Sequence, residues 1–206
     1  HIIFSEVMKM GKNIVVGQSG GPTAVINSSV AGVYSQAKKL GIDKVYGMVH
    51  GIEGFLEDQI CDLDDYLAAP AGVEMLKRTP SAFLGSCRFK MPKIEGNEEV
   101  YEKIFEVMEK HDIEYLFYCG GNDSMDTVKM LSDYAAHGKS QRFVGVPKTV
   151  DNDLPITDHC PGYGSAAKYI ATSLKEVIRD NSSFGAKKPT VVIVEIMGRN
   201  AGWLTA

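Results

Sequence analysis

The stretch Tyr118-Cys119-Gly120-Gly121-Asn122-Asp123-Ser124 lies between two different hydrophobic patterns. The run before it, residues 114–118, is short, aromatic and apolar, which indicates a buried strand. From residue 124 to 136 apolar side chains recur at mostly helical spacing, and Ser124 can serve as the N-cap. Ligands bind at the carboxyl ends of strands in an α/β sheet, and helix N-termini present free N–H groups to anions. We therefore expect a ligand site at this junction.

The same alternation of strands and helices continues along the chain. Predicted strands cover residues 13–17, 44–49, 114–118, 143–146 and 190–196. Predicted helices cover residues 23–40, 62–77 (broken at Pro70), 97–111, 124–136 and 163–179. This alternation is typical of βαβ units. The predicted fold is α/β, a three-layer, Rossmann-like parallel sheet with helices on both faces, followed by the start of a second, smaller α/β lobe.

The predicted organisation has three parts. Residues 1–11 are expected to be a poorly ordered extension, residues 12–160 to form the α/β domain, and residues 161–206 to begin the second lobe. The chain begins with His1 rather than Met, so Met8 or Met10 could be the natural start. It stops within what resembles a new helix. We therefore expect the sequence to be a fragment of a longer protein.

Composition excludes several classes of protein. A formal charge of −4 argues against general nucleic-acid binding, which prefers a basic face. The four cysteines, Cys61, Cys87, Cys119 and Cys160, are widely spaced and form no C-x-x-C pair, which favours reduced thiols over a disulfide or metal set. No apolar run approaches the ~20 residues of a membrane span. The sequence thus predicts a cytoplasmic protein with neither nucleic acid nor membrane as a partner.

Two loops offer groups that bind anions. Gly20 and Gly21 stand between a predicted strand and a helix, where glycine lets the backbone approach a phosphate. They match neither G-x-G-x-x-G nor Walker A, and a plain tight turn is an equal alternative. Arg88 can bind phosphate oxygens bidentately, although a solvated surface arginine is the simpler interpretation of the local sequence.

Two more segments carry candidate ligands. Asn122 and Asp123 offer side-chain oxygens beside backbone N–H donors, which suits Mg²⁺ bound together with substrate phosphates. The alternative is an Asx turn that caps the helix. Met197, Gly198 and Arg199 follow the last predicted strand, where a close backbone approach beside the arginine fits a sugar phosphate. A helix-capping arginine is equally open there.

The loop at residues 148–153 is the most informative segment. In an extended chain Thr149, Asp151 and Asp153 point the same way, because side chains alternate. Paired carboxylates repel, so one can be held as a base near neutral pH. Lys148 could neutralise charge on a transferring phosphoryl group, whereas the simpler alternative is a polar turn. Together these loops indicate phosphoryl transfer, in which catalysis is mostly positioning and electrostatics.

Five motifs, in this order, resemble the phosphofructokinase family. They are residues 17–21, 83–89, 120–124, 147–153 and 197–199, and the resemblance covers residues 12–206. It implies that residues 12–160 bind the phosphoryl donor and that residues 161–206 are the truncated beginning of the sugar-phosphate domain. It also implies a cytoplasmic glycolytic enzyme that uses Mg²⁺.

The resemblance implies a role for each motif residue. Asp151 would be the base that takes the proton from the 1-hydroxyl of fructose 6-phosphate, and Lys148 would support the transferring phosphate. The implied ligands of fructose 6-phosphate are Thr149, Asp151, Asp153, Met197, Gly198 and Arg199. The implied ligands of pyrophosphate are Gly20, Gly21, Arg88, Asp123 and Ser124. Mg²⁺ would lie near Asn122.

Two positions resemble the pyrophosphate-dependent members of the family. ATP-using members have glycine where this chain has Asp123, and a carboxylate there would crowd and repel the α-phosphate of ATP. They also have Pro-Gly-Thr where this chain has Pro147-Lys148-Thr149. The resemblance therefore implies reversible transfer from pyrophosphate to fructose 6-phosphate, giving fructose 1,6-bisphosphate and phosphate.

One position departs from the family pattern, and several alternatives stay open. Many members have Asp where this chain has Asn122, so an ion there would depend more on pyrophosphate and Asp123. The alternatives are an ATP-dependent phosphofructokinase, an NAD or diacylglycerol kinase with a similar Gly-Gly-Asp loop, and a non-catalytic regulatory subunit. Intact Asp151 and Asp153 disfavour the last of these. Sedoheptulose 7-phosphate is an alternative acceptor.

The family resemblance also bears on assembly. Members are dimers or tetramers with sites shared between subunits, so we expect a homo-oligomer. The family's later sugar-phosphate ligands lie beyond Ala206. The 206-residue chain alone is therefore expected to be inactive and to fold poorly in its last part.

Overall fold

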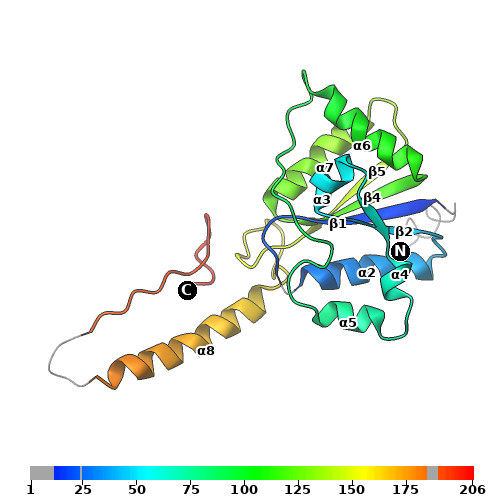
Figure 1. Cartoon of the computed structure of the whole chain (residues 1–206). Coiled ribbons are helices and arrows are strands. Elements are labelled where there is room, and N and C mark those ends of the chain that lie inside the picture. The colour runs from blue at the N-terminus through cyan, green and yellow to red at the C-terminus, as the bar shows by residue number, and fades with distance from the viewer. Residues whose placement is uncertain (1–11, 24, 185–189) are drawn as a thin grey trace. The chain divides into compact units, whose positions relative to one another are not determined.

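The computed structural model describes residues 12–23, 25–184 and 190–206 (Figure 1). The chain divides into two compact units, of which the first ends at Pro147 and the second begins at Lys148. The extension predicted at residues 1–11 lies outside the described residues, and the functional division at residue 160 stays a prediction. Within the described part of the chain, no helix is long and apolar enough to cross a membrane.

The first unit is built on a five-stranded sheet with the order β3-β2-β1-β4-β5. The strands are β1 (Asn13–Gln18), β2 (Val45–Met48), β3 (Ile60–Asp62), β4 (Ile113–Gly120) and β5 (Arg142–Pro147). Neighbouring strands are parallel except at one edge, where β3 runs antiparallel to β2. The sheet is therefore mixed: the predicted parallel sheet has one additional, antiparallel edge strand that the sequence did not predict. Only residues 49–59 separate β2 from β3, and a parallel crossover needs about a dozen residues or more.

The described chain contains seven helices, and all except α3 lie within or close to a predicted helical range. They are α2 (Ile26–Lys39), α3 (Gly51–Leu56), α4 (Asp64–Leu67), α5 (Gly72–Arg78), α6 (Glu98–Lys110), α7 (Asn122–Ala135) and α8 (Tyr163–Ser182). The expected break at Pro70 is confirmed, because α4 and α5 lie on either side of it. The sequence predicted neither α3 nor β3.

The sheet is covered on both faces, which confirms the three-layer prediction. Ile14 and Val16 of β1 belong to one buried cluster with residues of α2, α4 and α5. Val15 belongs to a second cluster with residues of α3, α6 and α7. Figure 1 shows the two groups of helices on opposite sides of the sheet. Successive side chains of a strand point to opposite faces, so one apolar run in β1 serves both clusters.

The second unit is much less regular in its described part. α8 contains no buried residue, and residues 190–198 form no strand. The prediction of a strand at residues 190–196 is therefore wrong. A strand requires ladder hydrogen bonds from a neighbour, and no described residue pairs with this segment. Its β-branched composition alone does not supply them.

Candidate active site

The sheet order places a topological switch point between β1 and β4. The chain leaves β1 for β2 on one side and leaves β4 for β5 on the other, so the connections diverge at this pair. The two strands end in matched register, with Gln18 opposite Cys119. Ligands of open α/β sheets bind at such switch points, outside the carboxyl ends of the strands. The two glycine-bearing loops predicted from sequence therefore start side by side.

The loop after β1 is fixed by backbone hydrogen bonds. The Ser19 N–H donates to the Cys119 carbonyl at 2.9 Å, and the Gly20 N–H donates to the Cys87 carbonyl at 2.9 Å. The Ser86 hydroxyl donates to the Gly20 carbonyl at 2.5 Å. Gly20 has a φ of 75°, which only glycine adopts without strain. The turn is thus tied both to the end of β4 and to the segment that carries Arg88.

Arg88 lies beside this turn. Its Nη2 is 3.9 Å from the point where a Cβ on Gly21 would stand. The side chain is exposed, and in the described part of the chain its guanidinium makes no hydrogen bond or ion pair. An exposed guanidinium next to a glycine turn retains its donors for an anion. This geometry is compatible with the predicted phosphate contact and with a solvated surface arginine, and the phosphate contact stays a prediction.

The start of α7 follows the end of β4, on the other side of this switch point. Gly121 is the N-cap, and its carbonyl accepts hydrogen bonds from the N–H groups of Ser124 and Met125, both at 3.1 Å. The prediction of Ser124 as N-cap is therefore wrong. Its buried hydroxyl is instead hydrogen-bonded to the hydroxyl of Ser19, which joins the two loops.

Gly120 is the residue that permits this hydroxyl pair. A Cβ at Gly120 would stand 2.0 Å from Ser124 Oγ and 2.5 Å from Ser19 Oγ. Both distances are far below van der Waals contact, so any side chain there would separate the two loops. The glycine at the end of β4 is thus required by close packing.

Asn122 and Asp123 occupy the exposed first turn of α7. Neither side chain makes a hydrogen bond or ion pair with the described residues. Their oxygens, beside N–H groups of the first turn, fit Mg²⁺ held jointly with a bound phosphate, because this ion keeps several waters and needs only one or two protein oxygens. Among the described residues no group of three or more His, Cys, Asp or Glu could hold a metal by itself.

Tyr118 and Cys119 are buried near the end of β4, on opposite faces of the sheet. Tyr118 is 2% exposed, and its hydroxyl accepts from the Ile52 N–H at 3.4 Å and lies 3.5 Å from Cys87 Sγ. Burial raises the pKa of Tyr118 above its ordinary range and raises the pKa of the Cys119 thiol to about 12. Both groups therefore remain neutral near pH 7 and place no negative charge beside the two loops.

Gln18 and Asn27 are two buried polar residues that the sequence analysis missed. Both are 0% exposed, and Gln18 Nε2 donates to Asn27 Oδ1 at 2.9 Å. A signal was present, because Gln18 follows directly on an apolar run that is typical of a fully buried strand. A polar residue in such a position needs buried partners.

The second unit contains the loop predicted to bind the acceptor. The Asp151 N–H donates to Thr149 Oγ1 at 3.1 Å. Asn152 has a φ of 54°, and its amide ties the loop to the next turn, donating to the Asp158 carbonyl at 3.3 Å and accepting from the Cys160 N–H at 2.8 Å. The side chain between the two aspartates therefore shapes the loop.

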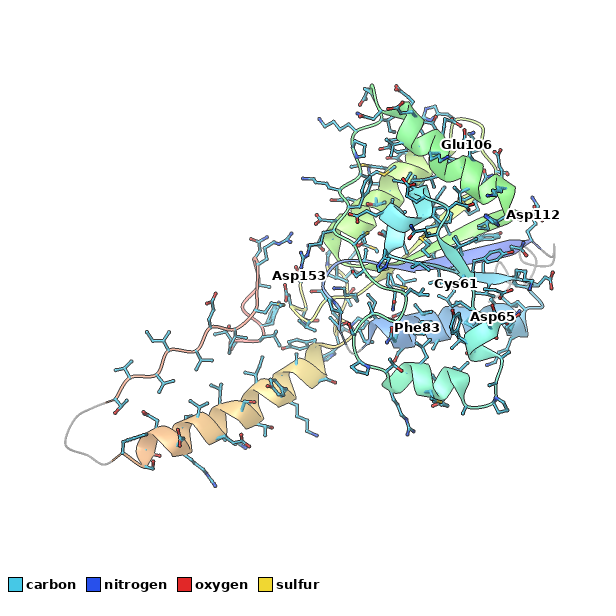
Figure 2. The ribbon with its side chains drawn as sticks, in the orientation of Figure 1. Cys61, Asp65, Phe83, Glu106, Asp112 and Asp153 are labelled. Atoms are coloured by element: carbon cyan, nitrogen blue, oxygen red, sulfur yellow. The ribbon has the colours of Figure 1, made fainter. Side chains whose placement is uncertain are left out.

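Asp151 and Asp153 each have one enclosed carboxylate oxygen without a partner. The Oδ1 atom of each is buried and accepts no hydrogen bond from the described residues. Figure 2 labels Asp153 among the side chains of this loop. A buried carboxylate oxygen without a donor is unusual in a folded protein, and such groups are concentrated at functional sites. The loop thus presents lone pairs that a substrate hydroxyl or a cation could satisfy.

Met197, Gly198 and Arg199 lie in a separate exposed segment of the second unit. A Cβ at Gly198 would stand 2.4 Å from the Ala201 carbonyl oxygen, so the turn requires glycine. The structure thus assembles Gly20, Gly21, Arg88 and Ser124 within the first unit. Thr149, Asp151 and Asp153 share one loop of the second unit. The functional roles of all these residues stay predictions.

The comparisons with known proteins agree with the five motifs. The sequence profile of the Phosphofructokinase family matches residues 13–206. The chain belongs to the phosphofructokinase family. A protein from Xanthomonas campestris named pyrophosphate–fructose 6-phosphate 1-phosphotransferase is 44% identical over 195 residues, covering 94% of this chain and 46% of the relative. A protein from Vibrio cholerae named ATP-dependent 6-phosphofructokinase is 35% identical over 196 residues, covering 95% of this chain and 56% of the relative.

A solved phosphofructokinase confirms the fold. The crystal structure of the pyrophosphate-dependent phosphofructokinase from Nitrosospira multiformis superposes with a TM-score of 0.85 at 45% identity. The match covers 94% of this chain and 48% of the solved one. The chain thus spans about half the length of these relatives.

Proposed function

We propose that the protein containing this chain transfers a phosphoryl group from pyrophosphate to the 1-hydroxyl of fructose 6-phosphate. The products are fructose 1,6-bisphosphate and phosphate, and the reaction is reversible. The observation that carries the proposal is the convergence of the Gly20-Gly21 turn, Arg88 and the first turn of α7 at the switch point of the sheet. The relatives named for this reaction support the choice of substrates.

On the donor side, the chain holds pyrophosphate through backbone and guanidinium donors. The Gly20-Gly21 turn and the N-terminus of α7 supply N–H groups, and Arg88 supplies a bidentate fork. Ser124 contributes a hydroxyl whose orientation is set by Ser19. Asn122 and Asp123 would hold Mg²⁺ jointly with the bound pyrophosphate. When bound, the ion neutralises part of the negative charge on the donor.

On the acceptor side, Asp151 acts as the general base. Its carboxylate takes the proton of the 1-hydroxyl as that oxygen bonds to a phosphorus of pyrophosphate and the bridging P–O bond breaks. Lys148 stabilises the charge on the transferring group, and phosphate leaves with the bridging oxygen. Thr149 and Asp153 orient the sugar, together with Met197, Gly198 and Arg199. The partnerless Oδ1 atoms of Asp151 and Asp153 support this assignment.

The preference for pyrophosphate over ATP rests on Asp123 and Lys148. Asp123 is exposed in the first turn of α7, where its carboxylate would repel the α-phosphate of a nucleotide. Lys148 supplies a positive charge to the transferring group. The wider setting is also part of the proposal: residues 12–160 serve the donor, residues 161–206 begin the sugar-phosphate domain, and the enzyme is a cytoplasmic homo-oligomer.

The test is phosphorylation of fructose 6-phosphate by the full-length protein, with Mg²⁺ and either pyrophosphate or ATP as the sole donor. We expect turnover with pyrophosphate only. Replacing both donor-specificity residues, in the Asp123→Gly/Lys148→Gly variant, should raise the KM for pyrophosphate. Asp126→Gly is the matched control, because it removes another exposed α7 carboxylate and carries the same cost of glycine in a helix. Unchanged pyrophosphate kinetics in the double variant would contradict the assignment of donor specificity.

A further inference from the structure

The segment at residues 79–88, here called the arginine loop, contains no helix or strand and ends at Arg88. An irregular segment normally runs over the surface because its backbone groups need partners. Part of this segment is instead buried: Leu84 is 4% exposed and Cys87 is 7% exposed. Figure 2 labels Phe83 on this loop. Its polar backbone groups must therefore find partners within the protein.

The partners come from two buried amides. The Leu84 N–H donates to Gln18 Oε1 at 2.9 Å. The Phe83 N–H donates to Asn27 Oδ1 at 2.9 Å, and Asn27 Nδ2 donates to the Thr79 carbonyl at 2.9 Å. The bond from Gln18 to Asn27 closes the network. Because both amides are 0% exposed, water cannot replace these bonds.

The network fixes the end of the loop that carries the arginine. Beyond Leu84, the Leu84 carbonyl accepts from the His50 N–H at 2.8 Å. A Cβ at Gly85 would stand 2.4 Å from His50 Nδ1, so the chain has no room to shift there. Next along the loop, the Ser86 hydroxyl donates a hydrogen bond to the Gly20 carbonyl, and the Cys87 carbonyl accepts one from the Gly20 N–H. The position of Arg88 beside Gly21 thus follows from anchors that begin at Gln18 and Asn27.

We propose that Gln18 and Asn27 are positioning residues for the phosphoryl donor. They touch neither donor nor acceptor; they hold the arginine loop so that the Arg88 guanidinium faces the Gly20-Gly21 turn. The inference rests on the proposed function, because it assigns the donor to this turn. A purely structural role for the two amides would affect the donor and the acceptor alike, whereas a positioning role affects the donor selectively.

The test uses the full-length protein and four variants. Gln18→Met keeps the side-chain length but removes both hydrogen bonds of the amide. Gln18→Glu keeps the acceptor for the Leu84 N–H but places a carboxylate oxygen against Asn27 Oδ1. Asn27→Asp keeps both of its acceptor contacts but places a carboxylate oxygen against the Thr79 carbonyl. Asn97→Ala is the control, because Asn97 also ties a loop through its side chain, to the Lys93 carbonyl at 3.0 Å, on the exposed surface.

The expected result is selective for the donor. Gln18→Met should raise the KM for pyrophosphate about ten- to a hundredfold, because a misplacement of about 1 Å can cost that much. The KM for fructose 6-phosphate should stay within about twofold of wild type, because the variant misplaces no residue that is proposed to bind the sugar. Hydrogen exchange of the arginine loop should accelerate in this variant and not in Asn97→Ala. Gln18→Glu and Asn27→Asp should also raise the KM for pyrophosphate, because each sets a buried carboxylate oxygen against another acceptor.

Other outcomes have distinct meanings. Equal losses for pyrophosphate and fructose 6-phosphate, or faster exchange with unchanged kinetics, would overturn the positioning role. If Gln18→Met does not fold, Asn27→Asp decides the question: its KM should rise for pyrophosphate and not for fructose 6-phosphate. If the wild-type protein uses ATP and not pyrophosphate, the proposed donor is wrong, and the KM for ATP tests the positioning role instead. A wild-type protein that uses neither donor would overturn both proposals.

Discussion

The unit that ends at Pro147 and the unit that begins at Lys148 differ in what their side chains do. In the first, two buried clusters cover both faces of a sheet, and the loops proposed to bind the donor are joined by paired hydroxyls and amides. In the second, α8 buries no side chain, while two aspartates retain carboxylate oxygens without partners. The difference teaches that this chain separates its stable frame from the loop proposed to be catalytic. Substitutions should therefore affect stability in one unit and turnover in the other.

The largest expected effect is on turnover, in the second unit. Asp151→Asn removes the proposed base, so the kcat of the full-length protein should fall by about 10²–10⁴-fold, with KM values changed far less. Asp158→Asn alters an exposed carboxylate nearby in sequence and is the control. Steady-state kinetics with pyrophosphate measures both. A kcat for Asp151→Asn equal to that of the control would remove Asp151 from the mechanism.

The largest effect on stability should occur in the first unit. Phe105 of α6 is 0% exposed, so Phe105→Ala should lower the free energy of unfolding by about 3–5 kcal/mol. Ile178 of α8 is 63% exposed, and Ile178→Ala should change it by less than about 0.5 kcal/mol. Urea unfolding of the 206-residue chain provides the comparison. Equal losses would show that α8 packs as tightly as α6.

A pair of glycines sharpens the comparison at smaller energies. Gly120→Ala forces a Cβ between the hydroxyls of Ser19 and Ser124 and should cost about 1–3 kcal/mol. At Gly164 of α8 the space that a Cβ would occupy has no other atom within 4 Å, so Gly164→Ala should stabilise the helix by about 0.5–1 kcal/mol. Thermal unfolding measures both changes: the melting temperature should fall for Gly120→Ala and rise for Gly164→Ala. A neutral Gly120→Ala would mean that the two loops separate without cost.

The smallest expected effect concerns acid stability at the edge of the first unit. Hydrogen bonds from Lys110 and then His111, the latter at 2.7 Å, lower the pKa of Asp58. A lowered native pKa means that the unfolded state binds the proton more tightly, so the contribution is present above the unfolded value of about 3.9 and disappears as the pH falls through the native value. Asp58→Asn should flatten the urea midpoint between about pH 5 and pH 2. High salt should reduce the difference, because the cluster is partly exposed. A wild-type midpoint already flat over this range would contradict the role of Asp58.

The sequence predicts the frame well where the hydrophobic pattern is strong. Helix α6 follows from the spacing of Ile104, Val107 and Met108, all of which are buried. The short elements α3 and β3 were not predicted, because a few residues do not establish a period. The strand expected at residues 190–196 fails for a different reason: β-branched residues favour extended chain, but pairing depends on a neighbour that local sequence does not reveal.

The sequence predicts only part of the candidate site. The glycines, Arg88 and the first turn of α7 are recognisable as candidates because each follows a strand or precedes a helix. Their convergence depends on the strand order, which no local pattern states. The role of Ser124 was misassigned because a capping serine and a serine bonded to a distant loop look identical in sequence. Gln18 and Asn27 were missed since amides carry no charge to draw attention to them.

The hydroxyl pair of Ser19 and Ser124 has a consequence for how the protein folds. The two residues are 105 positions apart, and they meet only after β1 and β4 have paired at the centre of the sheet. Closing so long a loop is a slow, non-local step compared with forming the helices on either side. The proposed donor site therefore has no local precursor: a growing chain acquires it only when residue 124 has joined residue 19. Pairing of these two hydroxyls reports that β1 and β4 have joined.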